Sequence, residues 1–224
     1  MTADLETVVP EHLWSATSRL RGVGVRTRMT CVRRPDGSLW VHSPIALTPA
    51  LVARLAELGP VTDVVAPNRF HHLFFRDFLT QFPSARGHVA RGLGDKIESL
   101  RDYPCVTTSH WPGLRRYDIE GIPALQESVW FHEETGTLIL TDLLFCFGRD
   151  NPLAVRCFAA LSGVYRNLRM SRAMRWWMVR DRAALRASVQ PLIDLPVQRI
   201  VVAHDTIVDT NAPDSLAAAF GWLP

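Results

Sequence analysis

Three short apolar runs in this sequence each lead to a side chain that can titrate or bind a metal ion. The runs are Thr62 to Ala66, Thr137 to Thr141 and Arg199 to Ala203, and the side chains that follow them are His71 and His72, Asp142, and His204. Apolar, β-branched runs of this length are typical of buried strands. Proteins of mixed α and β structure commonly place their sites where strands end. The pattern therefore predicts a mixed αβ fold with candidate site residues after three strands.

The composition limits the class of protein. The chain has 224 residues, which suits one large domain or two small ones. With 47% hydrophobic and 21% charged residues, it has the balance of an ordinary globular protein. Since no run of about 18 apolar residues occurs, we expect no transmembrane helix. The net charge of +3 is modest, and we therefore expect no nucleic-acid partner.

The four cysteines bear on the compartment. They are Cys31, Cys105, Cys146 and Cys157, and they form no CxxC pair. Such scattered spacing is typical neither of a disulfide framework nor of a zinc motif. The first 15 residues hold three acidic side chains and no apolar core of a secretory signal. We expect buried free thiols in a cytoplasmic protein.

Local patterns predict most of the elements. Val25–Val32 and Leu39–His42 are expected as strands around a turn at 34–37, and a helix is expected from Thr48 as N-cap to Gly59. Further elements are expected as a helix at 71–81, a strand at Val89, a helix at 95–100, strands at 127–132 and 137–144, helical structure over about 152–193, a strand at 198–203 and a helix at 213–220.

Each candidate site residue also has an ordinary structural explanation. A pair such as His71-His72 more often caps or packs than binds a metal, although imidazole is a common ligand for zinc or iron. Asp142 lies between apolar residues, where a carboxylate is costly to bury unless it is paired, hydrogen-bonded or bound to a cation. His204 fits a hydrogen-bonded core histidine equally well. Taken singly, each signal is weak.

Taken together, the order of these motifs resembles the metallo-β-lactamase superfamily. Its hydrolases have an H-x-H-x-D-H loop after a buried strand, an aspartate after a later hairpin, and a histidine after a last strand. Here Val64 to His72, Thr141-Asp142-Leu-Leu-Phe145 and Ala203-His204-Asp205 follow that order. The sequence looks most similar to a bacterial branch with an Asn-x-x-His-His loop. The resemblance implies one domain over 1–224, an αββα sandwich of two mixed sheets covered by helices, with a helical insert at about 152–193.

The departures from the family bear on the metal site. The first two histidines of the usual loop fall on Pro67 and Arg69, and the loop that carries a third falls near Gly121-Ile122-Pro123. The resemblance therefore implies that the first of two metals is absent. His71, His72, Asp142 and His204 would bind the second, a single divalent ion (zinc, or iron or manganese), or form a relic that binds none. Asn68, as an oxygen ligand or to hold a water, and His132, as a supporting residue, are weaker candidates.

The implied activity is metal-dependent hydrolysis of a small-molecule substrate that the sequence does not identify, with His71 as the candidate general base. The alternative is a catalytically inactive scaffold that acts as a binding or interaction protein. The helical insert, with Trp176-Trp177-Met178, is the candidate surface for a protein partner or a substrate lid. Its arginines, between Arg166 and Arg186, indicate either a face for an anionic partner or membrane surface, or a solvated face whose side-chain stems cover apolar neighbours.

Overall fold

The first predicted hairpin lies at the centre of a six-stranded sheet. In the computed structural model, which describes residues 4–19 and 25–223, β3 (Arg26–Arg33) pairs antiparallel with β4 (Leu39–His42). The turn between them requires a left-handed residue, and Gly37 supplies it with φ of 80°. Ser38 N donates to Asp36 Oδ1 at 3.0 Å within this turn. The predicted hairpin is confirmed.

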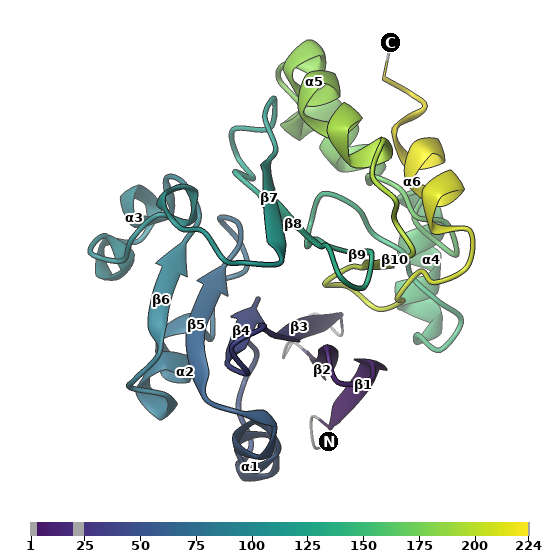
Figure 1. Ribbon diagram of the computed structural model, residues 1–224. Coiled ribbons are helices and arrows are strands. Elements are labelled where there is room, and N and C mark those ends of the chain that lie inside the picture. Colours follow the sequence, from purple (N-terminus) through teal and green to yellow (C-terminus); the bar gives the residue numbers. More distant parts are fainter. Residues whose placement is uncertain (1–3, 20–24, 224) are drawn as a thin grey trace. The chain divides into compact units, whose positions relative to one another are not determined.

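The six strands lie in chain order across the sheet (Figure 1). The other four are β1 (Leu5–Val9), β2 (Leu13–Arg19), β5 (Val61–Ala66) and β6 (Arg86–Val89). Strands β1 to β4 are antiparallel neighbours, whereas β4, β5 and β6 run parallel, so the sheet is mixed. Strands β5 and β6 are predicted from the sequence. Strands β1 and β2 are not.

Helix α1 (Pro49–Leu58) begins and ends where the sequence predicts. Thr48 Oγ1 accepts a hydrogen bond from Leu51 N at 3.2 Å, which satisfies a free donor of the first turn. Leu51 and Leu55 are buried in the apolar cluster of this part of the chain. The capping and the apolar spacing read from the sequence are both confirmed.

The helix predicted from His71 begins four residues later. Helix α2 spans Phe75–Gln81, and residues 70–74 form a bend and turns. Asn68 Oδ1 accepts hydrogen bonds from the backbone N of Phe70 (2.7 Å) and of His71 (2.8 Å). This side chain holds the segment in a local turn that competes with the helix. The prediction that His71 and His72 open a helix is therefore wrong.

Other short helices follow in this half of the chain. The helix predicted at 95–100 is two pieces, α3 (Leu93–Lys96) and a 3₁₀ turn (Glu98–Leu100). They are separated because Ile97 is extended, with φ of −134°. A further 3₁₀ turn spans Val106–Thr108.

A second sheet has four strands in the order β10-β9-β8-β7. They are β7 (Leu114–Asp118), β8 (Ser128–His132), β9 (Thr137–Ile139) and β10 (Arg199–Val201). Strand β8 pairs antiparallel with β9, as predicted for the second hairpin, and β9 pairs parallel with β10. The sheet is therefore mixed as well. Both β9 and β10 end earlier than predicted, so Asp142 and His204 follow their strands across short loops.

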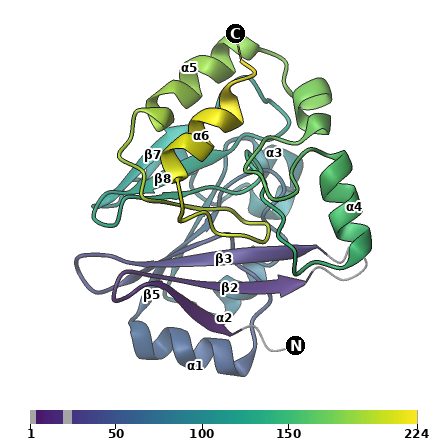
Figure 2. The same ribbon diagram turned by 90° about the vertical axis from the view of Figure 1, so that its right-hand side faces the viewer.

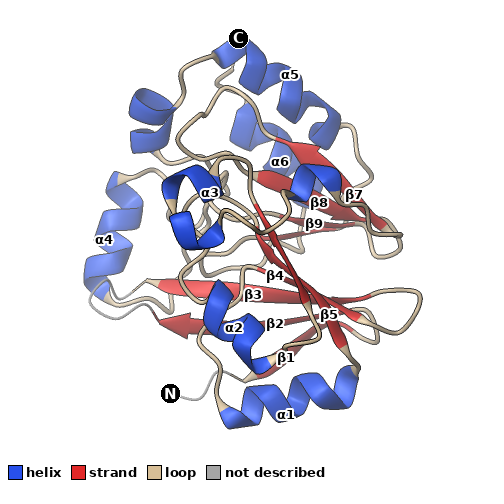
Figure 3. Cartoon of the chain, turned by 90° about the vertical axis from the view of Figure 1, so that its left-hand side faces the viewer, coloured by secondary structure: helices blue, strands red, loops and turns tan. Residues whose placement is uncertain are grey.

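Helices α5 (Arg182–Ile193) and α6 (Ala212–Phe220) cover the second sheet (Figure 2). Buried Leu185 and Phe220 belong to the same apolar cluster as the strand residues Leu138 and Ile200. Before them come α4 (Leu153–Leu161) and a π-helical turn (Met174–Met178), drawn among the blue segments of Figure 3. The predicted insert is thus helical in three places, with turns and isolated bridges over 162–171. The predicted closing helix is confirmed.

The chain divides into two compact units, Met1–Leu114 and Arg115–Pro224. Each unit has its own cluster of buried apolar residues. The single domain over 1–224 that the sequence indicates stays a prediction. Across residues 4–19 and 25–223, none of the helices combines the length and the apolar character needed to cross a bilayer.

The cysteines are free, but they are not all buried. Cys31 and Cys146 are buried, and burial raises the pKa of these thiols to about 12 and about 11. Cys105 is half-buried and Cys157 is exposed. The prediction of four buried thiols is therefore wrong for Cys157, because this residue lies on the exposed side of α4.

Candidate metal site

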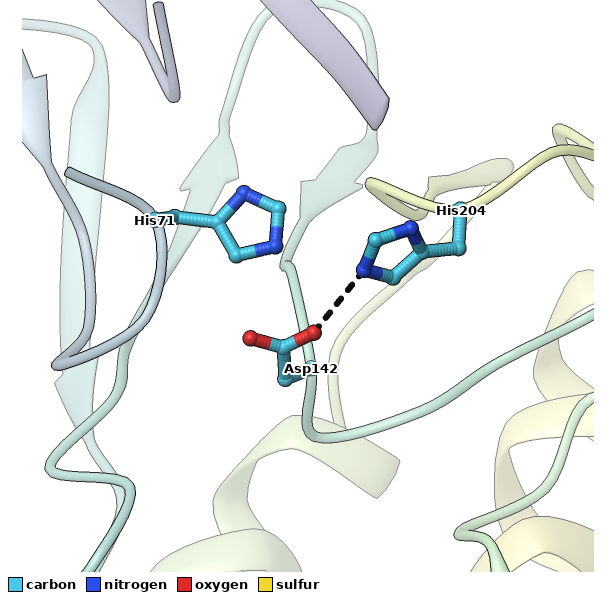
Figure 4. A group of neighbouring side chains, drawn as sticks. All are labelled: His71, Asp142 and His204. Atoms are coloured by element: carbon cyan, nitrogen blue, oxygen red, sulfur yellow. Dashed lines mark hydrogen bonds and ion pairs between the residues drawn. The ribbon is translucent and has the colours of Figure 1, made fainter. Parts of the chain in front are cut away.

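Asp142 and His204 contact each other directly. Strands β9 and β10 pair in parallel with Ile139 opposite Val201, and each of the two side chains comes three residues after its strand. His204 Nε2 lies 3.0 Å from Asp142 Oδ1 (Figure 4). Both residues are buried, at 8% exposure. Parallel strands thus bring a carboxylate and an imidazole together at their carboxyl ends, as is common for αβ sites.

A buried carboxylate fixes the loop that carries Asp142. Glu127, at the start of the second hairpin, is 1% exposed. Its carboxylate oxygens accept hydrogen bonds from three consecutive backbone N–H groups, those of Thr141 (2.7 Å), Asp142 (2.8 Å) and Leu143 (3.2 Å). Charge-assisted bonds of this kind are stronger than neutral ones. Sequence reasoning places Glu127 in a strand and misses this role, although a carboxylate beside an apolar strand signals a buried partner.

His204 is positioned by aromatic stacking on its ring and by hydrogen bonds to the next residue. It stacks on Phe145, with centroids 5.4 Å apart, and on Phe147 at 6.5 Å. The next residue, Asp205, has φ of 74°, a conformation that favours glycine. Asp205 Oδ2 accepts from Gly148 N (2.6 Å) and Asn151 Nδ2 (2.7 Å), and these bonds stabilise the strained backbone. They explain how an aspartate is accommodated where the family commonly has glycine.

His71 is oriented within the first unit by two polar contacts. Its backbone N is held by Asn68, and its Nδ1 lies 2.7 Å from Ser43 Oγ. Ser43 is itself buried and has φ of 55°, so its backbone is strained at the end of β4. If Nδ1 donates to Ser43 Oγ, Nε2 carries the lone pair that a metal or a proton needs. Asn68, expected as an oxygen ligand or to hold a water, uses Oδ1 to hold this turn.

His72 has different surroundings from His71. It lines a pocket with Leu73, Arg76 and Thr80 of the α2 region. Its pKa is lowered, first by burial and then by the charges of Lys96 and His71. His132, expected as a supporting residue, has its Nδ1 2.8 Å from Thr135 Oγ1 in the turn of the second hairpin.

A second polar cluster links β5 and β6 in the first unit. His88 Nε2 lies 2.9 Å from Asp63 Oδ1, and Ser109 Oγ lies 2.8 Å from His88 Nδ1. The ring nitrogens are used in the reverse order from a serine-hydrolase triad. Burial alone would raise the pKa of Asp63, but hydrogen bonds from His88, Trp111 and Thr62 and the charge of Arg34 lower it to about 2. The cluster therefore joins buried elements through an ionised carboxylate.

Comparison with solved structures identifies the fold. The chain is similar to a metallo-β-lactamase from Pontibacter korlensis (TM-score 0.61, 11% identity), covering 99% of this chain and 100% of that one. It is similar to a metallo-β-lactamase from Hirschia baltica (TM-score 0.64, 10% identity, 98% of each chain). It is also similar to the DIM-1 metallo-β-lactamase (TM-score 0.62, 10% identity, 99% of this chain and 98% of that one). The chain therefore has the metallo-β-lactamase fold, with its two mixed sheets and covering helices, as the resemblance implies.

Sequence comparison adds less. Residues 10–93 match a family model described as a domain of unknown function (DUF4336). No curated protein matches the sequence. At 10–11% identity the likeness to solved structures concerns the fold alone.

Proposed function

We propose that this protein is a metal-dependent hydrolase that binds one divalent ion through Asp142 and His204 of the second unit (Figure 4), with His71 as the third ligand that the sequence resemblance implies. Each of the three offers one ligand atom of a type that zinc accepts. The observation that carries the proposal is the buried contact between Asp142 and His204. A carboxylate so placed needs a cation, a proton or strong donors to offset its lost hydration.

The arrangement of the pair suits a shared ion. Two ligand atoms about 2.1 Å from a tetrahedral zinc lie roughly 3.4 Å apart. Asp142 Oδ1 and His204 Nε2 are 3.0 Å apart, so a small outward shift of either side chain would suffice. Glu127 and the stacked Phe145 already restrict both groups to this orientation. Such supporting contacts are typical of built metal sites.

The chemistry follows from the ion and from the residues around it. A divalent ion bound here would supply Lewis acidity, lowering the pKa of a water and polarising a carbonyl or phosphoryl group. Asp142 and His204 would hold that ion. His71 is proposed in two roles, as third ligand and as general base, and these are alternatives because a coordinated nitrogen has no free lone pair for a proton. Such chemistry suits the hydrolysis of carboxylic and phosphoric esters and of amides.

Metal content tests the proposal. The whole chain, purified without chelator, should contain close to one equivalent of zinc, iron or manganese by inductively coupled plasma mass spectrometry. Asp142→Asn and His204→Asn should each lose it, while keeping the circular dichroism spectrum of the parent. Loss of metal with His71→Ala assigns His71 as a ligand. Retained metal with lost hydrolysis assigns it as the base.

His72→Ala is the matched control, because the two histidines are adjacent and differ in surroundings. A three-ligand site predicts that His72→Ala keeps its metal. Loss of metal would instead support the four-ligand set that the sequence suggests. An unmodified protein with no metal, and with a thermal midpoint that added zinc does not raise, would contradict the hydrolase proposal.

The second candidate is a non-catalytic scaffold that binds a partner. It is favoured by a group of large apolar side chains exposed on the second unit, among them Trp176 and Trp177. A metal-loaded protein that hydrolyses no ester, thioester, lactam, lactone or phosphodiester in a broad panel would support this candidate.

A further inference from the structure

Exposed apolar side chains concentrate in one segment of the second unit. Seven large hydrophobic residues are exposed in the described part of the chain, and five of them fall between residues 153 and 177. The five are Leu153 (70%), Phe158 (59%), Leu161 (75%), Trp176 (73%) and Trp177 (74%). Two adjacent tryptophans at this exposure are unusual for a monomeric surface, where apolar groups of this size commonly mark an interaction site.

The five side chains belong to neighbouring elements. Leu153, Cys157 and Leu161 repeat every four residues along α4 and are exposed, so they form a stripe on one side of the helix. Arg172 joins the end of α4 to the segment before the π-helical turn, since its N donates to Ser162 O and its Nη1 to Leu161 O. Figure 2 shows α4 and the green helical segment that precedes α5 at the right-hand edge of this unit. We call these five residues the apolar face.

Positive charge is concentrated in the segment of the chain that carries the apolar face. Residues 149–182 contain eight arginines and two aspartates, a net charge of +6, while the whole chain has +3 and the remainder therefore −3. Within the described residues, no carboxylate forms an ion pair with any of these arginines, whose polar contacts go to carbonyl groups and aromatic rings. The five that are exposed, Arg149, Arg166, Arg172, Arg180 and Arg182, are therefore accessible to an anionic partner.

The combination of side chains selects the kind of partner. Tryptophan and arginine suit the headgroup region of a bilayer, while leucine and phenylalanine suit the acyl boundary beneath it. A cationic surface is attracted to anionic lipid. A second copy of the chain fits less well, because two faces of +6 would repel each other. A nucleic acid offers no apolar layer for Leu153 and Leu161.

We propose that the apolar face binds peripherally to the surface of an anionic lipid bilayer, with Trp176 and Trp177 in the headgroup region and exposed arginines of the same segment on lipid phosphates. Binding of this type lies in the interface and needs no spanning helix. It does not depend on the metal site.

The test uses the full chain and vesicles of two compositions, phosphatidylcholine alone and phosphatidylcholine with about 30% phosphatidylglycerol. Cosedimentation should show binding to the anionic vesicles only, weakened by about 0.5 M sodium chloride. Tryptophan emission should shift to shorter wavelength on binding. Trp14, Trp40, Trp111 and Trp130 are buried and Trp222 is half-buried, so the shift is assigned to the exposed pair by its loss in the double variant Trp176→Ser, Trp177→Ser.

The double variant Trp176→Ser, Trp177→Ser should bind anionic vesicles at least about tenfold more weakly than the parent. Its thermal midpoint should be unchanged. Leu73→Ser is the matched control, because Leu73 is 64% exposed but lies in the first unit, and its binding should equal the parent's. No binding to anionic vesicles, or equal binding by the double variant, overturns the proposal. The proposal is also overturned if the parent binds no vesicles but self-associates, or binds an acidic protein, and the double variant loses that interaction.

Discussion

Asp142 and His204 are 62 residues apart in the chain, the same separation as Ile139 and Val201, which pair between β9 and β10. The contact between the two side chains therefore continues the register of the parallel pair for three residues beyond the strands. Leu140 N donates to Val201 O at 3.0 Å in between, which extends the pairing towards the site. The candidate ligands are thus placed by the sheet as well as by their loops.

Glu127→Gln tests the support of the Asp142 loop. The change keeps the size of the side chain but replaces one acceptor oxygen by an NH₂ group facing backbone donors. We expect a loss of about 1–3 kcal/mol in the free energy of unfolding, measured by urea denaturation. We also expect weaker metal retention during dialysis against chelator, since the loop would hold Asp142 less firmly.

The control for this change is Glu133→Gln in the same unit. Its carboxylate pairs with Arg115 at the surface, with the Glu133 side chain 44% exposed, and exposed pairs contribute little. Equal stability and equal metal retention in the two variants would refute the role of Glu127.

Acid should destabilise the first unit through His42. This residue is buried, and burial, with the nearby charge of His71, lowers its pKa from 6.5 to about 3. The unfolded chain therefore binds a proton that the folded chain does not, and stability falls as pH decreases from about 6.5 towards 3. Urea denaturation of His42→Gln at several pH values should show a shallower dependence than the parent. If the free energies of unfolding of the variant and the parent fall equally with decreasing pH, His42 is not the cause.

Gly121→Ala should destabilise the second unit. Gly121 has φ of 80°, and a Cβ there would lie 2.2 Å from Asp181 O and 2.9 Å from Leu185 N at the start of α5. Because backbone atoms oppose the new methyl group, α5 would have to move. We expect a loss of about 2–4 kcal/mol in the free energy of unfolding. Gly113→Ala, which also has positive φ but open space around it, separates the clash from the conformational effect.

The single domain expected over 1–224 should unfold as one. Calorimetry should give one transition, with the calorimetric and van't Hoff enthalpies equal. The reason is that the similarity to whole metallo-β-lactamase chains extends over 98–99% of this chain rather than over one unit. Two resolved transitions would show that the units Met1–Leu114 and Arg115–Pro224 are separate folding domains.

Much of the fold could be predicted because its signals are local. The cap at Thr48, the turn at Gly37 and the apolar runs of β5 and β9 each depend on a few neighbouring residues. Strand β2 lacks such a signal, since buried Ser15 interrupts its apolar pattern. Its hydroxyl accepts from Arg28 Nη1 at 2.7 Å, a partner 13 residues away that no local pattern reveals.

The candidate site was predictable in its residues but not in its supports. Strand ends indicate Asp142 and His204, and the two side chains lie 3.0 Å apart, while their role as metal ligands stays a prediction. The hydrogen bonds of Glu127 and of Ser43 join segments 14 to 28 residues apart, so they depend on tertiary structure. The turn at His71 departs from the helical pattern because a single side chain, Asn68, outweighs the helical spacing of the apolar residues that follow.

The continued register of β9 and β10 also limits how this protein can change in length. Surface loops usually tolerate inserted or deleted residues. The three-residue steps from Ile139 to Asp142 and from Val201 to His204 do not have that freedom, because a residue gained or lost in one step alone would turn its last side chain away from the other. Only matched changes in both steps would preserve the contact. Homologues that keep this pair should therefore vary in residue type along the two steps, but not in their number of residues.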